Sequence, residues 1–254
     1  MEGLQHSSPV FQALAAGMFT WLLTAFGASA VLLKKDISQR LMDGLLGIAA
    51  GIMLAASFFS LLLPAIEMID SVAPVVFGFL AGGVFLRFLD IMIPHVHPFT
   101  GKEEGLRTSY KKITLFALAV TIHNIPEGMA VGVAFGRDFS SGISLAFGIG
   151  LQNIPEGVAI AVPLVAIGYT RLRSFIYGSL SAVVEPVFAL AGAFAVMYFH
   201  AILPYALSFA AGAMVFVVVE DLIPEAESNG NEDLATIMAL LGFAVMMTLD
   251  VALG

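Results

Sequence analysis

Two nearly identical hexapeptides lie in the middle of long apolar runs of this sequence. One reads His-Asn-Ile-Pro-Glu-Gly and starts at residue 123, and the other reads Gln-Asn-Ile-Pro-Glu-Gly and starts at residue 152. Residues three and four apart lie on one face of a helix, so each copy places its polar side chains in one stripe. The stripes consist of His123, Asn124 and Glu127, and of Gln152, Asn153 and Glu156. Each stripe therefore combines a carboxylate with neutral nitrogen or oxygen donors.

These stripes, together with Glu185 in a third apolar run, have the chemistry of metal ligands. A carboxylate inside a membrane is costly and indicates a functional site by default. The three runs contain no lysine or arginine, so the acids must be protonated or paired with a cation. The donors suit divalent zinc, iron or manganese better than copper(I), which prefers sulfur. Because two acids can bridge, we expect two adjacent metal positions. The alternative is that the amides only hydrogen-bond between helices.

Composition predicts an integral membrane protein. The 254 residues are 59% hydrophobic and 12% charged, with a mean hydropathy of +0.96, which leaves too little polar surface for a soluble domain. There is no cysteine, so disulfides and thiolate metal ligands are excluded. The lysines and arginines are scattered, which argues against nucleic-acid binding. We expect a single transmembrane domain over residues 1–254.

Eight segments are long and apolar enough to cross a bilayer, for which a helix needs roughly 20 residues. They are residues 9–32, 42–66, 73–93, 113–136, 142–168, 174–198, 202–224 and 235–253. The sequence therefore predicts an all-α integral membrane protein, a bundle of eight transmembrane helices around a metal site at the membrane midplane. Pro126 and Pro155 have no amide hydrogen, so we expect the fourth and fifth helices to kink there.

The distribution of positive charge predicts the orientation of the bundle. Of the 11 lysines and arginines, all but two fall in the first, third and fifth loops, whereas the loops on the opposite side hold only Arg137. Positively charged loops tend to stay in the cytoplasm. Both termini are therefore expected outside.

With these features the sequence resembles the ZIP family of divalent metal transporters. The eight spans, the external termini and the two hexapeptides carry the resemblance over essentially the whole chain, and the short loops look like those of compact bacterial members. The resemblance implies uptake of zinc, or of cadmium, iron or manganese, into the cytoplasm through a binuclear centre. It also implies a homodimer, in a bacterial cytoplasmic (inner) membrane, with metal as substrate and no organic cofactor.

The resemblance assigns ligands to two metal positions. The first would comprise His123, Glu127, Gln152 and Glu156. The second would comprise Asn124, Glu127, Asn153, Glu156 and Glu185. Glu127 and Glu156 would be shared, so the first position would have nitrogen and oxygen ligands and the second oxygen alone.

The resemblance also extends to a pathway through the membrane. Residues 51–60 look like the family's segment that faces the site, with Met53 as a soft contact and Ser60 as a polar step toward the outer mouth. At the cytoplasmic end of the seventh helix, Glu220 and Asp221 stand where many relatives place a histidine before an acid. An exit-side ligand made only of carboxylates could change the metal preference.

Three further residues could serve the pathway from its ends. His95 and His97 in the third loop could receive departing metal, as the family's histidine-bearing loop also suggests, and Glu67 could draw cations to the entrance. Each could equally be an ordinary solvated side chain.

Two other function classes use the same residue types. A membrane metalloenzyme could gather carboxylates in a bundle, as di-iron proteins do, but their Glu-x-x-His pairs and the His-Glu-x-x-His protease signature do not occur in this sequence. A proton or cation channel could use the same acids, because metal ligands must be deprotonated and binding is linked to pH.

Overall fold

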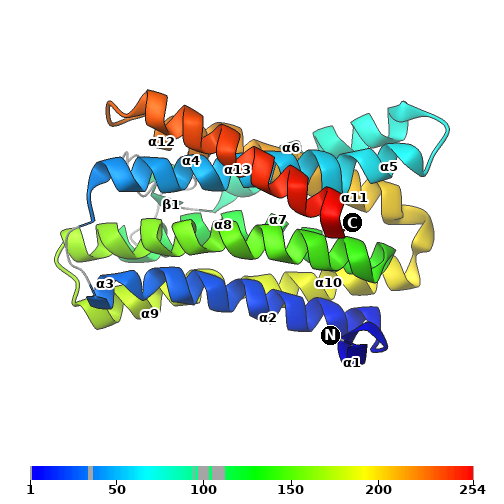
Figure 1. The fold of residues 1–254 in the computed structure, drawn as a ribbon, viewed down its shortest axis with the longest axis horizontal. Coiled ribbons are helices and arrows are strands. Elements are labelled where there is room, and N and C mark those ends of the chain that lie inside the picture. Colours follow the sequence, from blue (N-terminus) through cyan, green and yellow to red (C-terminus); the bar gives the residue numbers. More distant parts are fainter. Residues whose placement is uncertain (1, 34–36, 94, 97–102, 105–111, 254) are drawn as a thin grey trace.

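The long helices of the chain run along one direction and form a single bundle (Figure 1). The structure, a computed structural model, describes residues 2–33, 37–93, 95–96, 103–104 and 112–253. Its first half contains α1 (Glu2–Gln5), α2 (Pro9–Ala28), α3 (Ala30–Leu33), α4 (Gln39–Ala55), the π-helix η1 (Ala56–Leu62), α5 (Leu63–Glu67) and α6 (Val72–Met92). A two-residue antiparallel pair, β1 (His95–Val96) with β2 (Glu103–Glu104), follows.

The second half begins with two helices that carry the hexapeptides. Its elements are α7 (Lys112–Arg137), α8 (Phe139–Ala166), α9 (Arg171–Ser181), α10 (Val184–Tyr198), the 3₁₀ turn η2 (His200–Ile202), α11 (Leu203–Val217), the π-helix η3 (Val218–Leu222), α12 (Ile223–Ala226) and α13 (Glu232–Leu253). By length and composition, 7 helical segments among the described residues can cross a membrane. The 26 residues of α7 coincide with the remaining expected span, 113–136. The predicted all-helical membrane bundle is confirmed.

Several helices begin at a side chain that caps the first turn. Each cap accepts a hydrogen bond from a backbone N–H that has no partner within the helix, which matters most where water is scarce. The caps are Ser8 of α2, Ser38 of α4, Ser71 of α6, Asp138 of α8 and Thr170 of α9. These short polar residues fix where the spans start.

The sixth expected span, 174–198, consists of two helices. Helix α9 ends at Ser181 and α10 begins at Val184. Pro186 has no N–H to give to the carbonyl of Ala182, which instead accepts a hydrogen bond of 3.0 Å from the Glu185 N–H. The break places Glu185 in the first turn of α10, where the helix dipole favours a negative charge.

The second and seventh spans each contain a π-helical segment in front of a proline. Pro64 follows η1 and Pro224 follows η3, each two residues after the segment ends. Each proline removes the N–H that would bond the carbonyl four residues earlier, at Ser60 and at Glu220. Wide turns of this kind often mark functional sites. In α7 and α8, by contrast, the helix continues through Pro126 and Pro155, so the kinks expected there remain a prediction.

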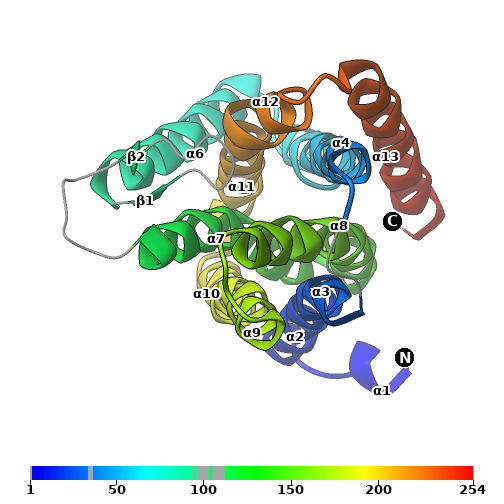
Figure 2. The same ribbon diagram turned by 90° about the vertical axis from the view of Figure 1, so that its left-hand side faces the viewer.

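The helices form two tightly packed groups, which Figure 2 shows end on. The first group consists of α2, α7, α8, α9 and α10, and the second of α4, α6, α11 and α13 with their short extensions. Glycines bring backbones together within each group. A Cβ at Gly132 of α7 would run into the Ala189 carbonyl of α10, and one at Gly82 of α6 into the Phe209 carbonyl of α11. A Cβ added at several other glycines of the described helices would also meet the backbone of another helix. In each of these cases the two helices belong to the same group.

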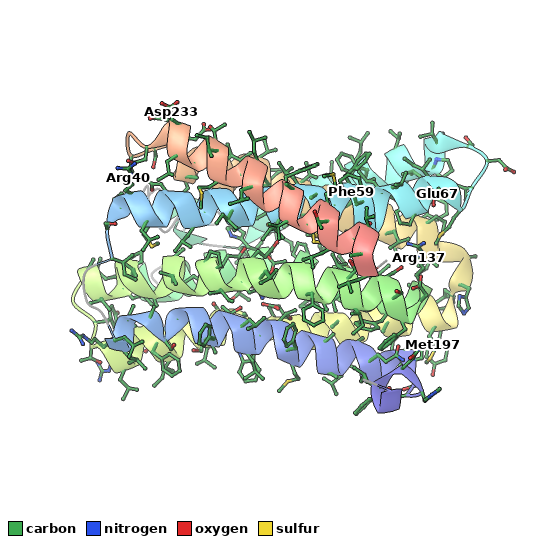
Figure 3. The ribbon with its side chains drawn as sticks, in the orientation of Figure 1. Arg40, Phe59, Glu67, Arg137, Met197 and Asp233 are labelled. Atoms are coloured by element: carbon green, nitrogen blue, oxygen red, sulfur yellow. The ribbon has the colours of Figure 1, made fainter. Side chains whose placement is uncertain are left out.

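The loops that connect the long helices lie at the two ends of the bundle, and both termini lie toward the same end (Figure 1). Arg40 and Asp233 lie at one end, and Glu67 and Arg137 at the other (Figure 3). The positive first and fifth loops and Arg137 thus lie on opposite sides, as the sequence predicts.

Candidate functional site

The predicted midplane residues meet between three helices of the first group. Helix α7 supplies Asn124 and Glu127, α8 supplies Gln152, Asn153 and Glu156, and α10 supplies Glu185. Glu127, Gln152, Asn153 and Glu185 are fully buried, with relative exposures of 0%. Glu127 lies close enough to Glu156 and Glu185 for their charges to interact. The acids that the sequence marked separately therefore form one cluster.

Asn153 holds Glu185 in place within this cluster. Its amide nitrogen Nδ2 donates to Glu185 Oε1 at 2.9 Å and to Oε2 at 3.0 Å, and it also lies 3.2 Å from the Thr20 carbonyl of α2. On the neighbouring helix, Asn124 Nδ2 lies 3.5 Å from the Ser181 carbonyl, at the end of α9. The amide nitrogens of Asn124 and Asn153 therefore face protein acceptors, whereas Nε2 of Gln152 has no hydrogen-bond partner among the described residues.

Several oxygens in the cluster have no hydrogen-bond partner among the described residues. They are both carboxylate oxygens of Glu127, Oε1 of Gln152 and Oδ1 of Asn153, and all are shielded from solvent. Burying an unpaired carboxylate carries a large penalty unless a cation or proton compensates. Oxygen donors with this environment suit a divalent cation. The chemistry of the donor set thus fits a metal substrate.

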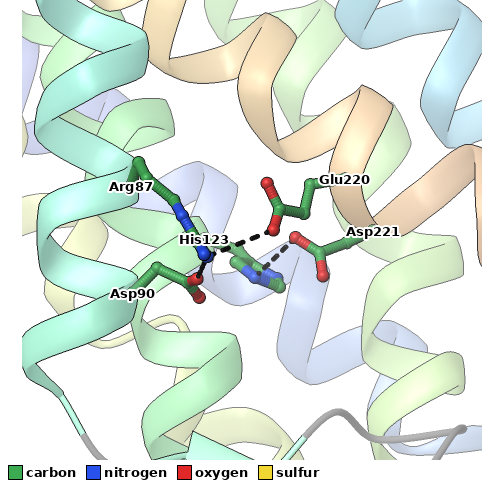
Figure 4. A network of polar contacts seen from close by, with 5 residues as sticks. All are labelled: Arg87, Asp90, His123, Glu220 and Asp221. Atoms are coloured by element: carbon green, nitrogen blue, oxygen red, sulfur yellow. Dashed lines mark hydrogen bonds and ion pairs between the residues drawn. The ribbon is translucent and has the colours of Figure 1, made fainter. Parts of the chain in front are cut away.

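His123 lies near Glu156 of this cluster, and its imidazole faces Asp221 of the second group of helices (Figure 4). Its Nε2 lies 3.1 Å from Oδ2 of Asp221, at the end of η3. Nearby, Arg87 and Asp90 of α6 contact each other, and Arg87 contacts Glu220. In the described parts of the chain, no three histidine, aspartate or glutamate side chains converge as a ready-made metal site. Neither predicted metal position is thus assembled as a ready-made site among the described residues, and the His123 imidazole contacts Asp221, so the ligand assignment stays a prediction.

The predicted entrance residues lie along the second span. Met53 is fully buried in α4, and Ser60 is 3% exposed in η1. The Ser60 hydroxyl donates to Asp250 Oδ1 of α13 at 2.6 Å. Glu67 lies exposed at the end of α5. His95 pairs with Glu104 through the backbone of the short strands, and its side chain, like all of His97, lies outside the described residues.

Sequence reasoning missed several polar residues that support the site or its approaches. Asp250 interrupts the last apolar span and partners Ser60. Asp43 is fully buried at the start of α4. Its carboxylate accepts hydrogen bonds from Gln39, Asn229 and Asn231 at 2.7, 3.1 and 2.8 Å. A single acid within an apolar span was the available signal for both, whereas all their partners except Gln39 come from distant parts of the sequence.

Comparison with known proteins places these features in a family. A family model described as ZIP zinc transporter matches residues 101–250. The human protein named zinc transporter ZIP11 is 39% identical over an alignment that covers 99% of this chain and 100% of the human protein. Zinc transporter GufA of Myxococcus xanthus is 38% identical, covering 95% of this chain and 98% of its own. Zinc transporter ZIPB of Bordetella bronchiseptica is 39% identical, covering 95% and 81%.

Proposed function

Because the chain belongs to the ZIP zinc transporter family, we propose that it carries zinc across a membrane through the cluster around Glu127. The family consists of transporters, so the protein is not an enzyme, and the metalloenzyme alternative is set aside. The fold is that of a multi-pass membrane protein. Cadmium, iron and manganese, which prefer similar donors, are candidate competing substrates.

The observation that carries this proposal is the environment of Glu127. Its carboxylate is fully buried and accepts no hydrogen bond from the described residues. Glu156 and Glu185 stand beside it, and the three spans contain no lysine or arginine. Three acids in such surroundings need a cation, and a transported divalent ion supplies two positive charges.

We assign the ligands in two overlapping sets. Glu127 and Glu156 would be shared, His123 and Gln152 would complete the first position, and Asn124, Asn153 and Glu185 the second. The free Oδ1 of Asn153 supports the second set, because the amide nitrogen is occupied by Glu185. The first set requires His123 to leave Asp221 and turn toward Glu156, near which it already lies.

Transport direction, membrane and assembly follow from the sequence pattern. The positive loops place the end with Arg40 in the cytoplasm, so metal would enter near Ser60 and Asp250 and leave near Glu220 and Asp221. The bacterial inner membrane and a homodimer are part of the same proposal and rest on the resemblance.

Uptake into proteoliposomes tests the proposal. The protein is expected to accumulate zinc with saturable kinetics, and Glu127→Ala and Glu156→Ala are expected to abolish uptake. Glu232→Ala changes an exposed acid at the start of α13 and serves as the matched control. Uptake at the wild-type rate by a folded Glu127→Ala variant would refute the assigned site.

Anomalous diffraction from crystals soaked in zinc tests the ligand sets. Two peaks between α7, α8 and α10 are expected, one beside Gln152 and one beside Asn153. A peak elsewhere in the bundle, with none beside Glu127, would contradict both sets.

A further inference from the structure

Arg87 lies between two acids at the cytoplasmic side of the bundle. Its Nη1 contacts Asp90 Oδ2 on its own helix and lies 3.5 Å from Glu220 Oε1 on η3 (Figure 4). Asp90 is 7% exposed, and the Arg87 side chain is half exposed. The same atom therefore joins carboxylates from two helices, α6 and the seventh span.

The position of Arg87 is the position that a departing cation would take. Zinc binds carboxylate oxygens at about 2.0–2.2 Å and can be shared by two carboxylates. One guanidinium nitrogen already contacts both Asp90 and Glu220. The adjacent Asp221 contacts His123, a candidate ligand of the midplane site. Metal leaving His123 would therefore meet Asp221 first, and the preceding residue, Glu220, is one of the two acids that Arg87 contacts.

We propose that Arg87 is a built-in competitor of the transported metal at the cytoplasmic exit and so keeps the exit acids from retaining it. This inference rests on the proposed function, and it assigns to Arg87 a role in release in addition to holding α6 against η3. The sequence alone indicated only a pair between Arg87 and Asp90.

The competition has a simple electrostatic basis. Arginine keeps its positive charge at all physiological pH values, so it can neutralise Asp90 and Glu220 permanently. Without it, the two carboxylates that share its contact would attract a divalent ion more strongly than either does alone.

Zinc uptake and zinc binding by Arg87→Gln test the proposal. The apparent KM for zinc and the maximal uptake rate are both expected to fall, the rate by roughly tenfold, the usual order for one charge-assisted contact. Purified Arg87→Gln is expected to retain one more zinc ion per chain than the wild type at equilibrium. If Arg87 served only to hold helices together, the rate would fall with unchanged KM and unchanged stoichiometry, which would overturn the proposal.

Three companion variants complete the design. Arg87→Lys keeps the charge but cannot bridge two carboxylates, so an intermediate shift in the same direction is expected. If Arg87→Gln does not fold, Arg87→Lys replaces it in the experiment. Zinc binding by Arg87→Lys at the wild-type level would then overturn the inference. Adding Glu220→Gln to Arg87→Gln removes one of the two acids that Arg87 contacts and should abolish the extra zinc ion. Arg40→Gln, an exposed arginine on the same side, should bind and transport as the wild type does.

The outcomes separate this inference from the proposed function. If the wild type takes up no zinc, or Glu127→Ala takes it up normally, the proposed function fails. If both behave as expected and Arg87→Gln keeps wild-type KM and stoichiometry, only the role of Arg87 fails.

Discussion

The buried carboxylate of Glu127 lowers the stability of the folded protein when no metal is bound. A buried carboxylate with no hydrogen-bond partner among the described residues destabilises the folded state by the desolvation it suffers. Asn153 partly relieves this penalty at Glu185 through two hydrogen bonds, whereas at Glu127 the Gln152 amide lies nearby without forming a hydrogen bond of ordinary geometry. The proposed zinc ion would compensate this charge, which the metal-free protein leaves largely uncompensated.

Glu127→Gln is therefore expected to stabilise the apo protein while abolishing zinc uptake. Glutamine keeps the shape and removes the charge, and the gain should be about 1–3 kcal/mol, or about 2–4 °C in melting temperature per kcal/mol for a chain of this size. Thermal unfolding in detergent with a metal chelator, together with proteoliposome uptake, measures both effects.

Ser144→Ala is the matched control for this change. Ser144 lies on the neighbouring helix α8. Its hydroxyl is fully buried and, like the Glu127 carboxylate, finds no hydrogen-bond partner among the described residues. It belongs to neither ligand set. Its removal should stabilise slightly and leave uptake unchanged. A lower melting temperature for Glu127→Gln would contradict the account of Glu127 as an uncompensated charge.

At the scale of the helices, the sequence predicts the spans and one part of the site. Spans follow from long apolar runs, and the convergence of α7 and α8 follows from the doubled hexapeptide. The break before Glu185 and the π-helical turns could not be placed, because Pro126 and Pro155 are tolerated inside helices while Pro64, Pro186 and Pro224 accompany irregular turns. Whether a proline stays within a regular helix or accompanies an irregular turn depends on the neighbouring helices. A local sequence pattern contains no information about those helices. The contact of His123 with Asp221, nearly a hundred residues away, was likewise beyond local reasoning.

Gly128→Ala is expected to separate α7 from α10 and reduce both stability and uptake. A Cβ there would collide with the backbone of Glu185, so α10 must move away from Glu127, the residue before Gly128. Alanine favours a helix by about 1 kcal/mol over glycine, but this gain is smaller than the usual overpacking penalty of about 1–3 kcal/mol. Melting temperature and the KM for zinc measure the effect.

Gly83→Ala provides the comparison on α6. The nearest atom of another helix to its added Cβ, the Gly212 carbonyl oxygen, is 3.7 Å away, an ordinary contact. Its stability should be unchanged or slightly higher. Equal losses in the Gly83 and Gly128 variants would show that helix contact is not the cause.

At the scale of the whole molecule, the two groups of helices hold different parts of the proposed route. The proposed midplane ligands lie on α7, α8 and α10 of the first group, whereas Ser60, Asp250, Glu220 and Asp221 lie on the second. Close backbone contacts through glycine lie within the groups. Between them, described contacts include side chains such as His123 with Asp221 and Gly148 against the Met246 side chain. Side-chain contacts can exchange partners more readily than interlocked backbones, so the boundary between the groups is the natural place for movement.

Spin labels at the end of the bundle that carries Glu67 and Arg137 can detect such a movement, and the absence of native cysteine makes labelling specific. A label pair at Glu67→Cys and Arg137→Cys spans the two groups, and a pair at Arg137→Cys and Met197→Cys lies within the first (Figure 3). Replacing the chelator with zinc should shift the distance distribution of the pair that spans the two groups. The distance distribution of the pair within the first group should stay unchanged. If neither pair shifts while uptake persists, the groups do not move as units, and zinc must pass through a bundle whose two halves stay fixed. If both shift, the first group itself deforms, and the glycine contacts within it do not make it rigid.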